Sequence, residues 1–232
     1  LNADLSNFDF KVPENLIAIH PVSPRHNSKL VVVSNKEFNI YKFSEIIKIL
    51  NPGDCLVVND TKVIPGRFVG KLRSKIINFT LNKNLSNKTV PIWEVLVKPL
   101  KLIKLKDVIM FKENIKGKIV GIDKTKKVGL VTLRFNCSIE ELQAFLNNNA
   151  SLALPNYIVK KRSFNVKDKY NYQTVFAKNA GAIAAPTASL HFSNKMLNEI
   201  KKRKIQIIKV TLHVNGGTFL PIKSKNINEH IM

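Results

Sequence analysis

The stretch AGAIAAPTASLHF, residues 180–192, carries almost no bulky side chain before Leu190. Small side chains allow another segment or a ligand to approach the backbone closely. Pro186 interrupts any ladder of backbone hydrogen bonds and leads the chain into a turn at Thr187. We therefore expect a tight turn here, against which the rest of the fold packs.

A helix and a strand are predicted directly after this turn. Ser193 is a favoured helix N-cap, and Met196 and Ile200 follow it at helical spacing. Basic residues at 201–204 fall in the last turn, where the helix dipole favours cations. The apolar run IQIIKVTLHV at 205–214 then predicts a buried strand.

Two turns of small residues therefore bracket this helix and strand. The second turn reads Asn215-Gly216-Gly217-Thr218, and each turn lies beside a histidine, His191 or His213. Tight packing around two structural histidines is one interpretation. A ligand site is the other, because the pKa of histidine suits it to proton transfer near neutral pH.

The overall composition is that of a globular protein. The 232 residues are 44% hydrophobic and 23% charged, so the chain can bury a sizeable core. Its apolar runs are short and interrupted by lysine, and no secretion signal is visible, so we expect a cytoplasmic protein with no membrane partner. Cys55 and Cys137 lie far apart and form no metal-ligand motif, so we expect no bound metal.

The net charge of +22 favours contact with polyanions, above all nucleic acid. However, 32 of the 38 basic residues are lysines, a bias that an AT-rich genome also produces. A solvated, lysine-rich surface is therefore the competing interpretation. The charge permits an RNA partner without requiring one.

A polar cluster is predicted at the end of an apolar strand in the first half of the chain. The run Cys55–Val58 contains no charged residue, which predicts burial on both faces, and Asn59, Asp60 and Thr61 follow it at once. Polar side chains just past a buried strand commonly form ligand sites in α/β proteins. Local capping of the backbone by the same side chains is the alternative.

The pattern changes between residues 71 and 135, where short β-rich segments alternate with lysine-rich turns. This spacing is typical of a small β-barrel or sandwich. Trp93 shares an alternating face with Val95 and Val97, which favours a core position over a base-stacking one. We see no aromatic cluster of the kind that stacks bases.

Several stretches, in the same order along the whole chain, resemble one family. No single stretch suffices, but together they resemble the S-adenosylmethionine:tRNA ribosyltransferase-isomerases of queuosine biosynthesis. The stretches are SNFDFKVPENLIA (6–18), LNPGDCLVVNDTKVIPGRF (50–68), WEVLVKP (93–99), LPNYI (154–158), YQTVFAKNAGAIAAPTASLHFS (172–193), VTLHVNGGTFLPIK (210–223) and EHIM (229–232).

The resemblance implies an enzyme that acts on tRNA with a GUN-type anticodon carrying 7-aminomethyl-7-deazaguanine. Such an enzyme transfers and isomerises the ribosyl moiety of S-adenosylmethionine, its co-substrate, onto the aminomethyl group. The products are epoxyqueuosine in tRNA, adenine and methionine. The family fold implies an α/β (α+β) main domain at 1–70 and 151–232, interrupted by an inserted small β-barrel domain at 71–150.

The chain also departs from the family pattern. Ser189 stands where the family has glycine, and Asn215-Gly216-Gly217 replaces the usual Gly-Ala-Gly. Family members continue well beyond the position of Met232, so we expect a C-terminally truncated member. It would act as a monomer, alone or with a separately encoded C-terminal portion. A catalytically inactive remnant that binds RNA only non-specifically is the alternative.

Residue types suggest roles in the implied reaction. His191 and His213 are candidate catalytic bases or acids, with structural roles as the alternative, and Asp60 could hold the aminomethyl group or a ribose hydroxyl. Backbone amides of the second turn could bind a carboxylate or a phosphate. Substrate-binding candidates are Asn59, Thr61, Arg67, Pro186, Thr187, Gly216, Gly217 and Thr218, and candidates for tRNA phosphate contacts are Lys160, Lys161 and Arg162.

Overall fold

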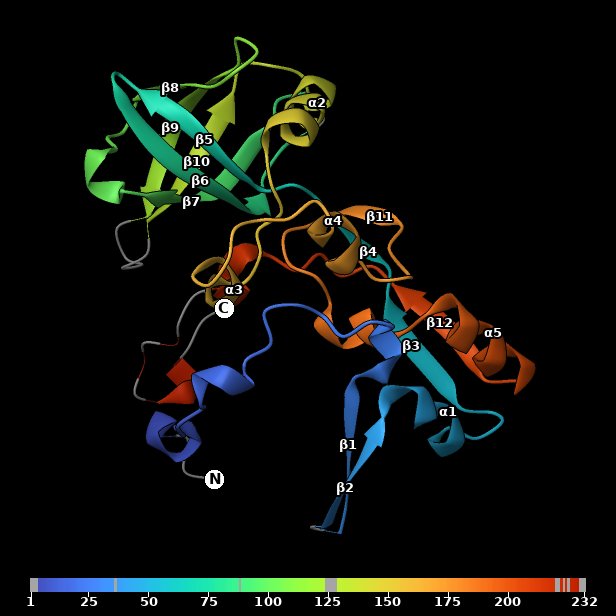
Figure 1. Cartoon of the computed structure of the whole chain (residues 1–232). Coiled ribbons are helices and arrows are strands. Elements are labelled where there is room, and N and C mark those ends of the chain that lie inside the picture. The colour runs from blue at the N-terminus through green and yellow to red at the C-terminus, as the bar shows by residue number, and fades with distance from the viewer. Residues whose placement is uncertain are drawn as a thin grey trace. The chain divides into compact units, whose positions relative to one another are not determined.

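A computed structural model describes residues 4–35, 37–87, 89–123, 129–219, 222, 224 and 226–229 (Figure 1). The chain forms two compact units, each assembled from segments that are distant in sequence. The barrel unit comprises Leu1–Ala18, Ile64–Ser163 and Asn215–Met232. The α/β unit comprises Ile19–Val63 and Phe164–Val214.

Six antiparallel strands close into a barrel in the order β10-β7-β6-β5-β8-β9. Buried and exposed residues alternate along these strands, as expected when one face lines a packed interior. The mixed α/β chain with a small β-barrel is thus confirmed. The strands are β5 (Arg67–Leu72), β6 (Lys75–Asn84), β7 (Ile92–Lys98), β8 (Val108–Met110), β9 (Lys116–Asp123) and β10 (Leu130–Phe135).

Phenylalanine rings fill the interior of the barrel. The ring centroid of Phe111 lies 5.4 Å from those of both Phe68 and Phe79. Phe145, from helix α2 (Ile139–Asn149), packs against Phe68 and Phe111 at 5.9 and 5.8 Å. Helix α2 thus contributes to the barrel core, beside which Figure 1 shows it. Trp93 is buried in the same unit, which confirms its predicted core position.

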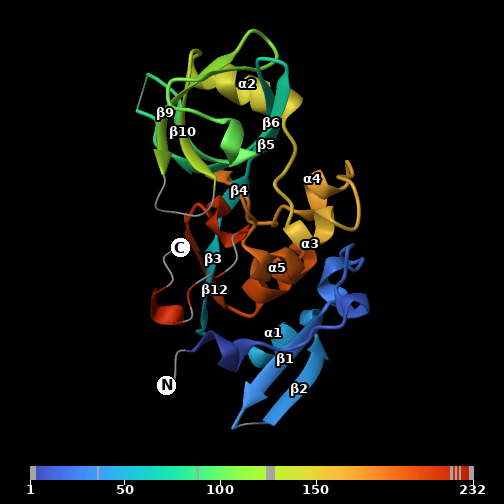
Figure 2. The same ribbon diagram turned by 90° about the vertical axis from the view of Figure 1, so that its left-hand side faces the viewer.

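Two parallel strand pairs form the sheets at the centre of the α/β unit. Strand β3 (Cys55–Asn59) pairs with β12 (Gln206–Val210), and β4 (Thr61–Val63) pairs with β11 (Asn179–Ala182). Helix α5 (Asn194–Lys202) lies beside β12 (Figure 2). Its residues Met196 and Ile200 share an apolar core with Val58 and Ile205. The Ser193 side chain accepts a hydrogen bond from the Met196 amide, which confirms the predicted N-cap.

Two burial predictions are wrong: β3 is not buried on both faces, and β12 is not a buried strand. Val57 is 59% exposed and Ile208 is 47% exposed, because helix α5 and its core cover only one face of the pair. Parallel strands in folded proteins are usually covered on both faces. Strand β12 also ends at Val210, earlier than predicted, because the residues that follow bond to side chains of the β3–β4 segment.

The remaining regular elements are short. Strands β1 (Lys29–Ser34) and β2 (Glu37–Lys42) form an antiparallel pair. The other α-helices are α1 (Ile46–Ile49), α3 (Asn156–Val159) and α4 (Asp168–Asn171). Short 3-10 helices lie at Leu5–Phe8, Glu14–Leu16, Arg25–Asn27, Phe43–Glu45, Leu100–Leu102, Thr187–His191, Gly216–Phe219 and Ile227–Glu229. Across the described residues, every helix is too short or too polar to span a bilayer.

Gly70 faces the barrel interior, where neighbouring side chains occupy the space that a larger residue would need. A Cβ on Gly70 would lie 2.5 Å from both Phe111 Cε1 and Ile109 Cγ2. We expect Gly70→Ala to lower the free energy of unfolding, measured in urea, by roughly 1–3 kcal/mol through overpacking. Gly217→Ala is the matched control, because nothing lies within 4 Å of the added Cβ. Equal stability of the two variants would contradict a tightly filled barrel.

Candidate functional site

The carboxylate of Asp60 joins three segments of the α/β unit. Its Oδ1 accepts hydrogen bonds from Thr211 Oγ1 at 2.6 Å and from Asn179 Nδ2 at 3.0 Å. Its Oδ2 accepts from the same Asn179 nitrogen at 3.1 Å. These bonds, chiefly the one from Thr211, lower the pKa of Asp60, so the buried carboxyl group is charged at neutral pH. A buried charge requires such partners, and here they fix the relative positions of the three segments.

The side chain of Asn59 extends the β3–β12 pairing beyond Val210. Asn59 Nδ2 donates to the Leu212 carbonyl at 2.8 Å, and the Leu212 amide donates back to Asn59 Oδ1 at 3.1 Å. The Thr61 amide also donates to Asn59 Oδ1 at 3.1 Å. The side-chain amide of Asn59 is thus engaged by backbone groups, and it holds the residue that precedes His213.

His213 is held by Thr61, which is fully buried. Nδ1 of His213 lies 2.7 Å from Thr61 Oγ1, and this hydroxyl donates to the Asn179 carbonyl at 3.4 Å. The Thr61 hydroxyl thus joins the imidazole to the backbone of β11, and which of Nδ1 and Oγ1 donates depends on the imidazole tautomer. The imidazole is exposed to solvent, and within the described chain its Nε2 makes no hydrogen bond. In the tautomer that carries its proton on Nδ1, Nε2 can accept a proton.

Gly181 allows the ring of His213 to lie directly on the backbone. A Cβ at Gly181 would lie 2.7 Å from both Cε1 and Nε2 of His213, and the φ of Gly181 is +154°. The amides of Ile183 and Ala184 donate to the Val214 carbonyl and fix the residue after the histidine. The close approach predicted for the small-residue stretch is therefore present at Gly181.

His191 lies in a different cluster of the α/β unit. Its Nδ1 is 2.9 Å from Ser28 Oγ, and its ring centroid is 5.2 Å from that of Phe43. Burial, and to a smaller extent the charge of Arg25, lowers the pKa of His191 and favours the neutral imidazole. In the described part of the chain no hydrogen bond or ring contact joins His191 to His213.

Two further candidates lie at the start of the 3-10 helix that carries His191. Pro186 immediately precedes this helix, and its carbonyl accepts a hydrogen bond from the Ser189 amide at 3.0 Å. Thr187 is the first helical residue, and it is exposed.

Other predicted site residues belong to the barrel unit. Gly216 begins the 3-10 helix Gly216–Phe219, and a Cβ on it would lie 3.1 Å from the Leu81 carbonyl oxygen. The Thr218 hydroxyl donates to the Asn215 carbonyl at 3.3 Å. Arg67, in β5, forms two backbone hydrogen bonds with Ser151.

Two of the three basic residues after helix α3, Lys161 and Arg162, bond to other groups of the protein. Lys161 Nζ lies 3.3 Å from Glu14 Oε2 and donates to the Glu14 carbonyl at 3.1 Å. Arg162 donates to the Ser163 carbonyl at 3.1 Å, whereas Lys160 follows the last residue of α3 and is exposed. Exposed ion pairs such as Lys161–Glu14 contribute little to stability. Lys161 can therefore exchange Glu14 for another anion at little cost in free energy.

The sequence analysis did not identify Asn179 and Thr211, the two residues whose side chains donate hydrogen bonds to Asp60. Thr211 comes directly after β12, so the rule that identified Asn59–Thr61 after β3 also applies to it. Thr211 was not identified because the strand predicted at 205–214 continued through it. Asn179 begins β11 and gave no comparable signal. Among the described residues, no group of three or more His, Cys, Asp or Glu side chains could hold a metal ion.

The fold and the site together define a mixed α/β protein with a β-barrel, in which polar side chains gather where parallel strands end. Such strand ends are where α/β proteins commonly bind ligands. The family model described as "Queuosine biosynthesis protein" matches residues 5–232, and the chain belongs to this family.

Known relatives carry a more specific name. An S-adenosylmethionine:tRNA ribosyltransferase-isomerase of Roseobacter denitrificans is 38% identical, and one of Halothermothrix orenii is 41% identical; each match covers 98% of this chain. The chain spans 65% of the length of both relatives. A solved S-adenosylmethionine tRNA ribosyltransferase of Thermotoga maritima is 28% identical, with a TM-score of 0.35 over 89% of this chain and 58% of its own.

The lowered pKa of His191 predicts a pH dependence of stability. The unfolded chain binds a proton at this residue near pH 6.5, the ordinary pKa of histidine, whereas the folded chain binds it only at lower pH. The stability contribution is therefore fully present above pH 6.5 and is lost as the pH falls towards the folded pKa. We expect His191→Gln to reduce the loss of unfolding free energy between pH 7 and 5. The exposed His20→Gln is the control, and the same pH slope in both variants would contradict the assignment.

Gly181→Ala tests the contact between backbone and imidazole. The added methyl group would displace the His213 ring and require a φ that alanine rarely adopts, so we expect a loss of roughly 1–3 kcal/mol in unfolding free energy. The imidazole signals of His213 in NMR should shift as its hydrogen bond to Thr61 breaks. Ala180→Ser, at an exposed position of the same strand, should change neither measurement. An unchanged His213 signal in Gly181→Ala would show that the ring does not depend on this glycine.

Proposed function

We propose that this chain transfers and isomerises the ribosyl moiety of S-adenosylmethionine onto 7-aminomethyl-7-deazaguanine in tRNA. The products would be epoxyqueuosine in tRNA, adenine and methionine. Family membership supports the proposal, as do relatives 38% and 41% identical that are named for this activity. The observation that carries it is His213, whose ring is exposed and makes no hydrogen bond at Nε2 within the described chain, while Thr61 and Gly181 fix its position.

In this proposal His213 is the general base. The positively charged sulfur of S-adenosylmethionine acidifies the neighbouring ribose C–H bond, and Nε2 of His213 takes this proton. Asp60 stays charged because its pKa is lowered, so it provides negative charge within the cluster that holds His213. We assign the base to His213 rather than to His191, because burial and the Ser28 contact restrict access to the His191 ring.

Asn59 then has a positioning role. Its side chain holds the Leu212 backbone and thereby fixes the position of His213. Positioning of His213, rather than contact with the substrate, is therefore its main role in this proposal. The sequence also assigns substrate-binding or phosphate-binding roles to other residues, which we retain in the proposal. These residues are Arg67, Pro186, Thr187, Gly216, Gly217, Thr218, Lys160, Lys161 and Arg162. Thr61 instead has a positioning role, because it is buried and its hydroxyl contacts His213.

The proposal extends to partners and organisation. The tRNA substrate would carry a GUN-type anticodon, and the domains would divide at 1–70, 71–150 and 151–232. A separately encoded portion would join an otherwise monomeric chain in catalysis. The open face of the β3–β12 pair supports this last point, because Val57, Ile208 and Val210 are exposed where parallel strands are usually covered.

Adenine release from S-adenosylmethionine with precursor-bearing tRNA tests the proposal. The chain is assayed alone and mixed with the portion of the Halothermothrix orenii relative that it does not span. We expect His213→Ala to lower the rate about 10²–10⁴-fold, the usual contribution of a general base, and the exposed His20→Ala to leave it unchanged.

Two negative results of this assay would have different meanings. Wild-type rates in His213→Ala would remove this residue from catalysis but leave the activity in place. If the wild-type chain released no adenine under either condition, the inactive RNA-binding remnant would be the better description.

A further inference from the structure

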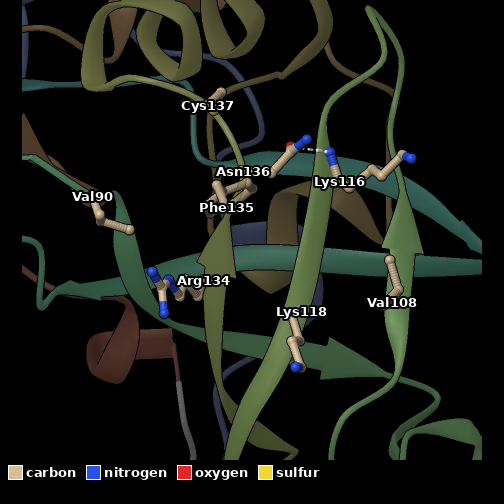
Figure 3. A pocket seen from close by; sticks show the side chains of 8 residues that line it. All are labelled: Val90, Val108, Lys116, Lys118, Arg134, Phe135, Asn136 and Cys137. Atoms are coloured by element: carbon tan, nitrogen blue, oxygen red, sulfur yellow. Dashed lines mark hydrogen bonds between the residues drawn. The ribbon is translucent and has the colours of Figure 1, made fainter.

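A basic hollow of about 450 Å³ lies on the outer face of the barrel (Figure 3). Its cations are Lys116, Lys118 and Arg134, and none of its lining residues is acidic. Val90 and Val108 add apolar surface on either side of these cations.

The strand register places the cations in adjacent rows. Lys118 of β9 and Arg134 of β10 are directly opposed, so their side chains share the outer face, and Val108 of β8 extends the same row. Lys116 lies two residues before Lys118, on the same side of β9. The Lys116 amide is fixed by Asn136 Oδ1 at 2.6 Å, the hydrogen bond drawn in Figure 3.

The opposed cations do not help the barrel to fold. Like charges that are directly opposed on neighbouring strands repel each other and destabilise the sheet. All three cationic side chains are exposed, and within the described residues none of them forms an ion pair. The stability of the barrel does not depend on these charges, because buried phenylalanine rings form its core.

We propose that the face formed by Lys116, Lys118 and Arg134 binds the backbone phosphates of RNA. The identity of the RNA as tRNA rests on the proposed function. Arginine binds a phosphate through two parallel N–H groups, and the lysines supply point charges beside it. The net charge of +22 would attract the polyanion over a longer distance.

The hollow is suited to phosphates rather than to bases. Base stacking needs exposed aromatic rings, and the aromatic residue that lines the hollow, Phe135, is 2% exposed with its ring in the barrel core. Contacts to phosphates carry no sequence information by themselves. Binding at this face should therefore depend on salt and charge, and not on the RNA sequence.

The test compares two double variants that remove the same number of charges. Lys118→Gln/Arg134→Gln removes the opposed pair, and Lys98→Gln/Lys101→Gln removes two exposed cations elsewhere in the barrel unit. Fluorescence anisotropy measures binding of a labelled tRNA transcript and of an unrelated RNA hairpin of equal length, over a series of salt concentrations.

We expect Lys118→Gln/Arg134→Gln to weaken the binding of both RNAs about tenfold. The slope of log affinity against log salt should become shallower by roughly 1.4–1.8, because about 0.7–0.9 is lost for each of the two phosphate contacts. The control variant should change affinity by at most about twofold. The melting temperature of Lys118→Gln/Arg134→Gln should equal or exceed that of the wild type, because removing the pair relieves repulsion.

Four outcomes would overturn the inference: no binding by the wild type, equal losses in both variants, no loss in either variant, or a lower melting temperature in Lys118→Gln/Arg134→Gln. Displacement of RNA by polyglutamate as readily as by unlabelled RNA would also count against it. Adenine release measured on the same preparations separates the two proposals. Selective loss of RNA affinity without any wild-type adenine release would support this site and reject the proposed enzyme activity.

Discussion

The α/β unit depends on the buried charge of Asp60. The carboxylate of Asp60 is 5% exposed and needs hydrogen-bond donors, which come from residues 119 and 151 positions further along the chain. These bonds connect the end of β3, the start of β11 and the segment after β12. The position of His213 follows from this connection, because Thr211 and Leu212 are both fixed immediately before it.

Much of the fold could be predicted because its signals are local. Alternating apolar residues specify the barrel strands, and the Ser193 cap specifies the start of α5. The burial of β3 and β12 could not be predicted in the same way. An apolar strand favours the packing of other elements on both of its faces. The exposed Val57 and Ile208 show that the sequence of the strand does not determine whether such elements are present on each face.

The candidate site was predictable only in part. Asp60 and Thr61 follow an apolar strand, which identified them, whereas Asn179 and Thr211 became relevant only through long-range pairing. His191 and His213 flank one helix and strand in the sequence, yet they contact different neighbours, Ser28 and Thr61. Proximity along the chain fixes the local turn, while the partners of a side chain depend on tertiary packing.

The interleaving of the two units has a consequence for biosynthesis. Strand β3 is translated early, but its parallel partner begins at Gln206, and Gln206 pairs with Cys55. At about 5–20 residues per second, a ribosome needs on the order of ten seconds to make the intervening chain. During this interval the edges of β3 remain unpaired, a condition that favours aggregation and recruits chaperones. The barrel strands, which are contiguous in sequence, can assemble in the meantime, so the nascent chain would carry one folded part beside one that still awaits its last strand.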